Sequence, residues 1–421
     1  MVFAVSAIFA VKQVQISRHI IYWQKRPPAA KLLGQQRLQT EPATIQTPAT
    51  IQWLRAGQEI FPAMLQAIAM ARTSILLETY IYSDGKLGMQ ILDALLAAAR
   101  RGVQVQVLVD AIGSWLLPDD FFSPLVAAGG MARRFNPIHP LRFGVRDHRK
   151  LLICDNRVIF LGGFNVADEY DGDGIARGWC DFGVRLENTE LAGSLAESFH
   201  ALFALAEFHQ QAWSQFRAFR GKRKIKFGAM GDVLVARPGR GASPFQLALY
   251  RDLSHAKSVQ IVTPYFLPTR RLRRDLIRAA RAGGRVELIL AGKTDVLVSQ
   301  LAARSLYHRL LKAGVQIYEY QPQILHAKLI VIAGVVYLGS SNLDIRSLNL
   351  NYELMVRFHD REVTAESQKI FAWMLEHSKK IELQSWKAQP FWQRWRNHWA
   401  HFLLTRIDPF VALSQFRTLK K

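Results

Sequence analysis

The chain has 421 residues, and 50% of them are hydrophobic. This length and composition predict two globular domains and exclude an intrinsically disordered chain. The 55 Lys and Arg residues outnumber the 33 Asp and Glu residues, which leaves a net charge of +22. So large an excess predicts a polyanionic partner, either nucleic acid or an anionic membrane surface; a basic surface that only serves solubility is the alternative.

The N-terminal segment, residues 1–51, begins with the apolar run MVFAVSAIFAVKQ, which Lys12 interrupts. The run is too short to span a bilayer, and it lacks the basic start and small-residue cleavage site of a secretory signal. We expect this segment to be either an interfacial anchor or a poorly ordered leader. No later stretch has the length of a transmembrane helix, so any membrane contact should be peripheral.

Two stretches of the chain follow the same order of predicted elements. Residues 74–114 indicate a strand, a helix that ends at RRG, and a second strand. Residues 258–292 repeat this order with a helix that ends at AGG. The chain is therefore predicted to be an internal duplication with one copy in each half.

The boundaries follow from changes in composition. The apolar spacing in residues 194–213 predicts a helix that closes the first half. Residues 216–245 are rich in Gly, Arg and Lys and show no long period, which predicts a junction. We therefore expect a first domain at 52–215, a second domain at 246–385 and a C-terminal segment at 386–421.

A histidine–lysine motif follows the first β-α-β unit, in DHRKLLICDNRVIFLGGFN. His148 and Lys150 are two residues apart, so on a strand they point to one face, and Asp155 completes the pattern H-x-K-x-x-x-x-D. A histidine there can act as nucleophile or general acid, and the lysine can hold a phosphate oxygen. The glycines before Asn165 permit close backbone approach, and the Asn165 amide can donate to a phosphate. These residues predict a phosphate-handling site.

A second copy of the motif follows the second unit, in LHAKLIVIAGVVYLGSSN. His326 and Lys328 have the same spacing, and Asn342 ends the segment. The interval from histidine to asparagine is seventeen residues in the first copy and sixteen in the second. Ala333 stands where the first copy has its aspartate. One such strand is a weak signal, whereas two in matched contexts predict a duplicated site.

No pattern in the sequence predicts a metal site. Cys154 and Cys180 lack the spacing of a zinc site or a disulfide framework, and Cys154 should pack in a core. No H-x-x-x-H pattern or acid–histidine cluster appears. The other histidines are predicted to be surface or capping residues, among them His139, His200, His209, His308 and His359.

The segments HRKLLICDNRVIFLGGFN, TPYFLP and GSSNLDIRSLNLNYE resemble the phospholipase D superfamily, and its bacterial cardiolipin synthase branch most closely. The resemblance extends over about residues 52–380. It implies an α/β fold of two tandem phospholipase D-like domains, each a mainly mixed β-sheet flanked by helices, related by a pseudo-two-fold axis with one shared active-site cleft. Displacement at phosphorus needs a nucleophile on one side and an acid on the other, which would explain the duplication.

The resemblance also implies roles for the motif residues. His148 would attack a phosphodiester to give a phosphatidyl-histidine, and His326 would protonate the departing alcohol and then deprotonate the incoming one. Exchanging these two roles fits nearly as well. No metal or other cofactor is implied, because the non-bridging oxygens would be held by Lys150, Lys328, Asn165 and Asn342.

Each histidine needs a carboxylate that fixes its tautomer and ring orientation. In the first half, Asp181 in GWCDFGVRL follows His148 by thirty-three residues; in the second, Glu353 in LNYELMVRF follows His326 by twenty-seven. Both match family positions for the orienting acid, so we expect one such acid for the histidine of each half. An ordinary surface acid on a strand is the alternative. The motif aspartate has a supporting role in the family, so we expect activity to survive Ala333.

The C-terminal segment has an aromatic stripe and a basic flank. Its stripe, at helical spacing, is Trp392, Trp395, Trp399 and Phe402. Its flank is Arg394, Arg396, His398 and Arg406. Such a helix suits an anionic membrane interface, and the alternative is a helix docked on the core through its tryptophans. The arginine-rich residues 268–285 and the basic residues 219–227 suit either lipid head groups or nucleic acid.

Three functions follow from these features. The first is a phosphatidyltransferase that makes cardiolipin from phosphatidylglycerol, alone or with another phospholipid. The second is a phospholipase D-type phosphodiesterase that hydrolyses phospholipid or nucleic acid, and the third is a catalytically silent basic binding module. The Trp-rich tail and the cardiolipin synthase-like motifs favour the first, as a peripheral protein of the bacterial inner membrane.

Overall fold

The computed structural model describes residues 50–136, 145–207, 224–227, 230–239 and 241–407. Several expectations lie outside the described residues, namely the N-terminal anchor or leader, His139, His209 and the end of the C-terminal segment. Within these ranges, the structure has no helix that is both long and apolar enough to cross a bilayer.

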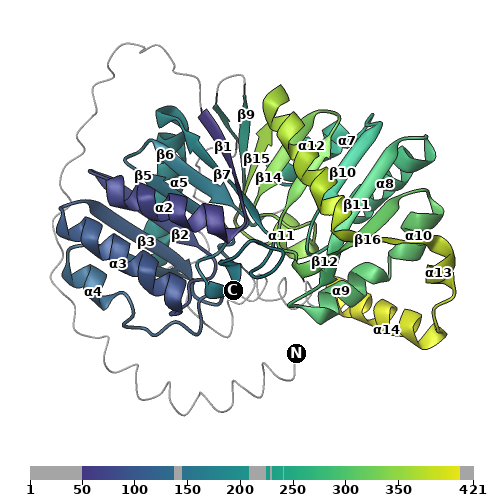
Figure 1. Cartoon of the computed structure of the whole chain (residues 1–421), viewed down its shortest axis with the longest axis horizontal. Coiled ribbons are helices and arrows are strands. Elements are labelled where there is room, and N and C mark those ends of the chain that lie inside the picture. Colours follow the sequence, from purple (N-terminus) through teal and green to yellow (C-terminus); the bar gives the residue numbers. More distant parts are fainter. Residues whose placement is uncertain (1–49, 137–144, 208–223, 228–229, 240, 408–421) are drawn as a thin grey trace, which may run out of the picture. The chain divides into compact units, whose positions relative to one another are not determined.

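The first half is built on a mixed sheet of seven strands (Figure 1). In sheet order these are β1 (Thr50–Arg55), β7 (Phe182–Glu187), β6 (Val158–Gly162), β5 (Leu151–Cys154), β2 (Ser74–Thr79), β3 (Gln104–Asp110) and β4 (Met131–Phe135). β2, β3 and β4 are parallel, and the other neighbours are antiparallel. Ile75, Leu76 and Leu77 are all buried, as expected of a central strand covered on both faces.

The second half repeats this sheet and adds a strand at each edge. In sheet order its nine strands are β16 (Ser378–Ile381), β12 (Gln316–Ile324), β11 (Arg285–Lys293), β10 (Ser258–Val262), β13 (Leu329–Ile332), β14 (Val335–Gly339), β15 (Glu353–Phe358), β9 (Gly231–Ala236) and β8 (Lys224–Phe227). The strands from β12 to β9 match those from β4 to β1 in order and direction. The predicted duplication is confirmed.

Helices cover both faces of each sheet. In the first half they are α2 (Gly57–Met70), α3 (Lys86–Arg100), α4 (Ser123–Ala127), the 3₁₀ turn η2 (Asp168–Tyr170) and α5 (Thr189–Glu207). In the second half they are α7 (Pro244–Leu253), α8 (Arg270–Arg281), α9 (Leu297–Arg304), α10 (Tyr307–Lys312), α11 (Ile345–Asn349), α12 (Arg361–Glu376), α13 (Leu383–Lys387), α14 (Phe391–Phe402) and the π-helical turn η3 (Leu403–Ile407).

The main core is shared by the two halves. The helices α2 and α3 pack on one face of the first sheet, and α7, α8 and α10 pack on one face of the second. The remaining faces pack with α5 and α12 in one continuous apolar cluster that contains residues from both sheets. Both halves therefore contribute side chains to one apolar core.

The junction between the two halves is shorter than the predicted residues 216–245. Residues 224–227 and 231–236 are strands of the second sheet, and α7 already begins at Pro244. The second domain therefore starts before residue 246. The Gly-, Arg- and Lys-rich composition did not predict these short strands. They join the second sheet because β9 pairs with β15, which lies far later in the chain, as well as with β8. Of the helix predicted at 194–213, the described residues 194–207 lie in α5.

Candidate active site

Both motifs lie at equivalent edges of the two sheets. They were predicted on strands, but His148 and Lys150 lie just before β5, and His326 and Lys328 lie just before β13. Because β5 is antiparallel to β2, and β13 to β10, these segments lie at the carboxyl ends of β2 and β10. Carboxyl ends of parallel strands commonly form the binding edge in α/β sheets.

The motif residues alternate in direction as expected of extended backbone. Arg149 is buried, and its guanidinium donates to Glu78 Oε1 (Nε–Oε1 2.8 Å) and to Ser198 Oγ (2.8 Å) in α5. His148 and Lys150 consequently share the opposite side, toward the second half. Both side chains approach the Tyr80 ring, whose centroid lies 5.3 Å from Lys150 Nζ, so they point to one face as predicted.

Short backbone contacts join the motif segments across the two halves. Asp147 forms an isolated parallel bridge with Tyr352, and Cys180 forms one with Leu325. Each of these four residues directly precedes a predicted catalytic histidine or orienting acid. The two bridges therefore bring each histidine beside the acid of the other half.

Residues of the second half contact His148, the motif histidine of the first half. The His148 backbone N–H donates to the Tyr352 carbonyl (3.0 Å), and His148 Nδ1 lies 3.0 Å from Glu353 Oε2. The Ser340 hydroxyl donates to the same carboxylate oxygen. The Tyr80 ring packs edge-on against the imidazole, with centroids 4.9 Å apart. If Nδ1 donates to Glu353, Nε2 carries the lone pair that can attack.

Residues of the first half contact His326, the motif histidine of the second half. The His326 backbone N–H donates to the Cys180 carbonyl (2.8 Å), and His326 Nδ1 lies 2.6 Å from Asp181 Oδ2. Lys328 Nζ lies 3.1 Å from His326 Nε2, and the Tyr170 hydroxyl lies 3.4 Å from the same nitrogen. A reacting group at Nε2 would therefore meet a cation and a phenol.

The expectation of an orienting acid within the histidine's own half is wrong. Asp181 contacts His326, and Glu353 contacts His148. The spacing in the sequence could not distinguish these pairings, because either one uses the same four residues. The surface-acid alternative is also wrong, since Asp181 is 2% exposed and Glu353 is 0% exposed.

In the pair of His326 with Asp181, the acid is ionised. Burial, reinforced by Lys328, lowers the pKa of His326 to about 4, although Asp181 opposes this shift. Burial alone would raise the pKa of Asp181, but Lys328, His326 and the Phe182 backbone N–H together bring it below its ordinary value. Near neutral pH, Asp181 is a carboxylate beside a neutral imidazole.

In the pair of His148 with Glu353, the pKa of the acid is raised instead of lowered. Burial raises the pKa of Glu353 to about 7, against the opposing effects of Lys150 and Ser340. Burial, together with Lys150 and Lys328, holds the pKa of His148 well below its ordinary value. His148 is therefore neutral, and its acid stabilises an imidazolium less strongly than Asp181 does.

Both motif lysines are buried and titrate near neutral pH. Lys150 Nζ donates to the His148 carbonyl (2.7 Å), and Lys328 Nζ donates to the His326 carbonyl. Burial lowers the pKa of Lys150 to about 7 and that of Lys328 to about 8, although the site carboxylates oppose the shift. A bound phosphodiester would favour the charged form of each lysine.

The two predicted phosphate-binding asparagines are also buried. Asn165 Oδ1 accepts a hydrogen bond from the Ile81 N–H (3.1 Å), and its Nδ2 donates to the Tyr170 hydroxyl (2.6 Å). Asn342 Oδ1 has no partner among the described residues. Tyr170, which contacts both Asn165 and His326, was not predicted; its only signal is its place five residues after Asn165 in ADEYD.

Asp155 does not lie with the other predicted site residues, and its assignment as catalytic is corrected. It follows β5, at the end of that strand remote from His148 and Lys150. Its carboxylate accepts hydrogen bonds from the backbone N–H groups of Arg72 (3.0 Å), Thr73 (2.7 Å) and Ser74 (3.2 Å). Asp155 therefore anchors the start of β2.

The hairpin turns explain the difference in motif length. Asp155, Asn156 and Arg157 separate the paired residues Cys154 and Val158. In the second half only Ala333 and Gly334 separate Ile332 from Val335, so that hairpin is one residue shorter. Asp155 (φ 53°) and Ala333 (φ 48°) both have a positive φ, and their N–H groups donate to Ser74 and Ser258, respectively.

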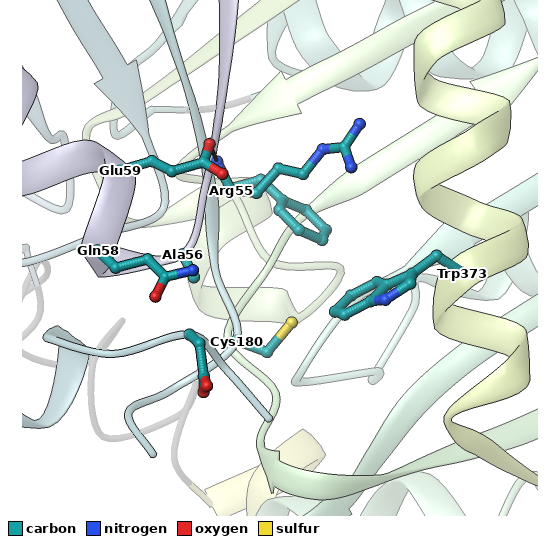
Figure 2. Close-up of a pocket in the computed structure, with 8 residues that line it drawn as sticks. Arg55, Ala56, Gln58, Glu59, Cys180 and Trp373 are labelled. Carbon is teal, nitrogen blue, oxygen red and sulfur yellow. Dashed lines mark hydrogen bonds between the residues drawn. The ribbon is translucent and has the colours of Figure 1, made fainter. Parts of the chain in front are cut away.

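A small cavity of about 170 Å³ lies behind Cys180, where the first half meets α12 (Figure 2). It is lined by Arg55, Ala56, Gln58, Glu59, Asp173, Cys180, Phe182 and Trp373. Burial raises the pKa of the Cys180 thiol to about 12, so the thiol is not a nucleophile. The Cys180 carbonyl holds the His326 backbone, so this cavity adjoins the support of the site rather than its reacting atoms.

Two copies of one sheet, each with an H-x-K histidine paired to a carboxylate of the other copy, define a two-domain enzyme of the phospholipase D superfamily. The family model described as cardiolipin synthase, PLD-like domain, matches residues 64–203 and 249–375. The chain belongs to this family. It is a phosphatidyltransferase of the phospholipase D superfamily.

Named relatives agree with this membership. Cardiolipin synthase B of Escherichia coli (strain K12) is 36% identical over 324 residues, which cover 74% of this chain and 76% of the relative. The probable cardiolipin synthase YwiE of Bacillus subtilis (strain 168) is 31% identical over 348 residues, which cover 80% of this chain and 68% of the relative.

Solved structures with low sequence identity share the fold. Phosphatidylserine synthase of Haemophilus influenzae Rd KW20 superposes with a TM-score of 0.69 at 17% identity, covering 86% of this chain and 95% of that protein. Polyphosphate kinase of Porphyromonas gingivalis gives a TM-score of 0.56 at 15% identity over 82% of this chain and 52% of that protein.

Proposed function

We propose that this protein is a cardiolipin synthase that transfers a phosphatidyl group from phosphatidylglycerol to the hydroxyl of a second lipid. The observation that carries the proposal is the reciprocal pairing of His148 with Glu353 (3.0 Å) and of His326 with Asp181 (2.6 Å). It equips one shared site with two oriented imidazoles. Two-step transfer at phosphorus needs one imidazole as nucleophile and one as proton carrier.

In the first step, His148 Nε2 attacks the phosphorus of the donor lipid. The new N–P bond forms as the bond between phosphorus and the glycerol oxygen breaks, and His326 gives its Nε2 proton to that oxygen. Released glycerol and a phosphatidyl-histidine result. His326 must be protonated for this step, and the negative charge of a bound phosphodiester raises its pKa toward that state.

In the second step, neutral His326 takes the proton from the hydroxyl of the acceptor lipid. The acceptor oxygen attacks phosphorus, and the N–P bond to His148 breaks. The product is cardiolipin when the acceptor is phosphatidylglycerol, and both histidines return to their starting states. Water in place of the acceptor would give phosphatidic acid.

The different acids support this division of roles. Asp181 has a pKa below its ordinary value and stabilises the imidazolium that His326 must become. Burial raises the pKa of Glu353 to about 7, so it orients His148 with less charge stabilisation and leaves the imidazole neutral for attack. His148 is therefore the proposed nucleophile.

The charged transition state is stabilised by groups that are already in place. We assign the non-bridging phosphate oxygens to Lys150, Lys328, Asn165 and Asn342. All four are at most 4% exposed, so their interactions with phosphate are screened less than they would be in water. Asp155 has no part in this assignment.

The proposed substrates are phospholipids, with phosphatidylglycerol as the donor, and the enzyme works as a peripheral protein on the inner membrane of a bacterium. The support comes from the relatives named cardiolipin synthase and from the net charge of +22, which suits an anionic lipid surface.

The test is to incubate the purified chain with phosphatidylglycerol in mixed micelles containing a chelator and to identify the lipid products by mass spectrometry. Cardiolipin with released glycerol is the expected result, and His148→Ala should abolish it. Phosphatidic acid alone would make the protein a hydrolase. No lipid product, or near-normal turnover by His148→Ala, would overturn the proposal.

A further inference from the structure

The aromatic side chains of α14 face away from the protein. Their exposed fractions are 51% for Trp392, 62% for Trp395, 46% for Trp399 and 51% for Phe402. The helix packs on α9 through its other side, where Asn397 and Ala400 are buried. Ala400 joins a small apolar cluster with Leu301 of α9. The alternative in which the tryptophans dock this helix on the core is therefore wrong.

The helix lies near the edge of the second sheet that carries the histidine site. Beyond the end of β11, the Asp295 carboxylate accepts a hydrogen bond from the Tyr265 hydroxyl (2.7 Å) and lies close enough to Lys328 to influence its pKa. The helix α9 begins two residues later, at Leu297, and α14 runs alongside α9 (Figure 1). The exposed aromatic stripe is thus attached to the rim of the site.

Other exposed apolar side chains occur at the same edge of both sheets. Leu297, at the start of α9, is 63% exposed. In the first half, Trp115 (45%) and Leu116 (71%) lie in the loop after β3. β3 ends at Asp110, whose carboxylate accepts a hydrogen bond from the Asp147 N–H (2.9 Å) next to His148. Exposed apolar groups of both halves therefore lie at the ends of strands that border the site.

Positive charge accompanies these apolar groups. Arg394, Arg396 and His398 of α14 are exposed, and the sequence of α14 contains no Asp or Glu. The Arg396 guanidinium lies 5.9 Å from the centroid of the Trp392 ring. Arg273 of α8 is near enough to His401 of α14 to lower its pKa, in addition to the larger effect of burial. Arg273 therefore adds a positive charge beside α14.

We propose that α14, Leu297 and the Trp115–Leu116 loop form a docking surface for an anionic phospholipid bilayer. Tryptophan rings and arginine side chains both suit the interface between head groups and acyl chains. The aliphatic Leu116 and Leu297 favour lipid over nucleic acid, because bases stack on aromatic rings and gain little from leucine. Docking here would present head groups to His148 and His326; this consequence rests on the proposed function.

The test compares the full chain with Trp395→Ser/Trp399→Ser in co-sedimentation with phosphatidylcholine vesicles, with and without phosphatidylglycerol. The matched control is Met70→Ser/Met131→Ser, because Met70 (68%) and Met131 (42%) are exposed at the opposite, amino-terminal edge of the first sheet. The tryptophan variant should lose at least about tenfold in binding to phosphatidylglycerol vesicles, while the control stays within about twofold of the wild type. Thermal unfolding checks that both variants are folded.

A second measurement separates docking from chemistry. His148→Ala should bind vesicles like the wild type, and the tryptophan variant should keep its turnover of monomeric short-chain phosphatidylglycerol while losing turnover on vesicles. Vesicle binding that is unchanged in the tryptophan variant, equally weakened in the control, or indifferent to phosphatidylglycerol would overturn the docking surface. The docking surface would also be overturned if the wild type bound no vesicles and the tryptophan variant instead lost binding to single-stranded DNA. Absence of lipid turnover with normal vesicle binding would refute the proposed function alone.

Discussion

His148 and Glu353 are 205 residues apart in the chain, and yet His148 Nδ1 lies 3.0 Å from Glu353 Oε2. The reciprocal contact joins His326 to Asp181 across 145 residues. For the two motif histidines, neither half supplies both the imidazole and the carboxylate that contacts it. The two halves therefore complete each other's histidine–acid pairs, and they share one apolar core.

The crossed pairs predict different failures for the two acids. A phosphatidyl ester of p-nitrophenol needs no proton for its leaving group, so Asp181→Asn should keep the initial burst of p-nitrophenol and then stall. Glu353→Gln should slow the burst itself by about 10²–10⁴-fold, because His148 loses its orienting acid. Rapid-mixing absorbance measurements distinguish the two results.

The matched control for this comparison is Glu366→Gln. Glu366 forms a partly exposed ion pair with Arg55 between the halves, and neither residue contacts a motif histidine. We expect near-normal burst and turnover from it. If Asp181→Asn lost the burst and Glu353→Gln retained it, the nucleophile would be His326 and the proton carrier His148.

The motif lysines predict an alkaline limit to activity. Their pKa values in the folded protein, about 7 for Lys150 and about 8 for Lys328, lie below the ordinary value of 10.5, so positive charge is lost as pH rises through this window. The ratio kcat/KM, which reports the free enzyme, should fall over the same range. Lys150→Arg should move the start of this fall up by about one pH unit, because arginine stays charged. An unchanged profile would show that Lys150 does not set the limit.

Asp155 should matter for stability and little for chemistry. Asp155→Ala leaves the N–H groups of Arg72, Thr73 and Ser74 without their acceptor, which should cost about 1–2 kcal/mol of unfolding free energy. Turnover per folded molecule should stay within about threefold of the wild type. Denaturant unfolding and a micelle assay measure the two quantities.

The same carboxylate gives a pH dependence with a definite sign. Burial alone would raise the pKa of Asp155, but hydrogen bonds from Thr73, Arg72 and Ser74 outweigh it, so the folded pKa lies below the ordinary 3.8. Its contribution is therefore present above that value and is lost as pH falls through the folded pKa. The difference in unfolding free energy between wild type and Asp155→Ala should disappear on acidification. A difference that stays constant would contradict the anchoring of β2 by the Asp155 carboxylate.

Ala333→Asp should stabilise the second half. Ala333 has φ 48°, a conformation that aspartate tolerates better than alanine. Its N–H already donates to Ser258 as Asp155 donates to Ser74, so a carboxylate there can reach the backbone at the start of β10. We expect up to about 1 kcal/mol of added stability, with turnover unchanged or raised. Ala333→Asn is the uncharged control, and a destabilised Ala333→Asp would show that no such N–H groups are available.

The sequence by itself predicted the duplication, the two β-α-β units and the two H-x-K motifs, because hydrophobic period and motif spacing are local properties. It did not reveal β8 and β9, which join the sheet through the pairing of β9 with the distant β15. It also placed Asp155 with the catalytic groups, although the carboxylate anchors β2. Pairing of His148 with Glu353 and of His326 with Asp181 was decided only by tertiary structure. The outward direction of the α14 tryptophans was decided there too, because helical spacing defines a stripe and only packing on α9 selects which side is buried.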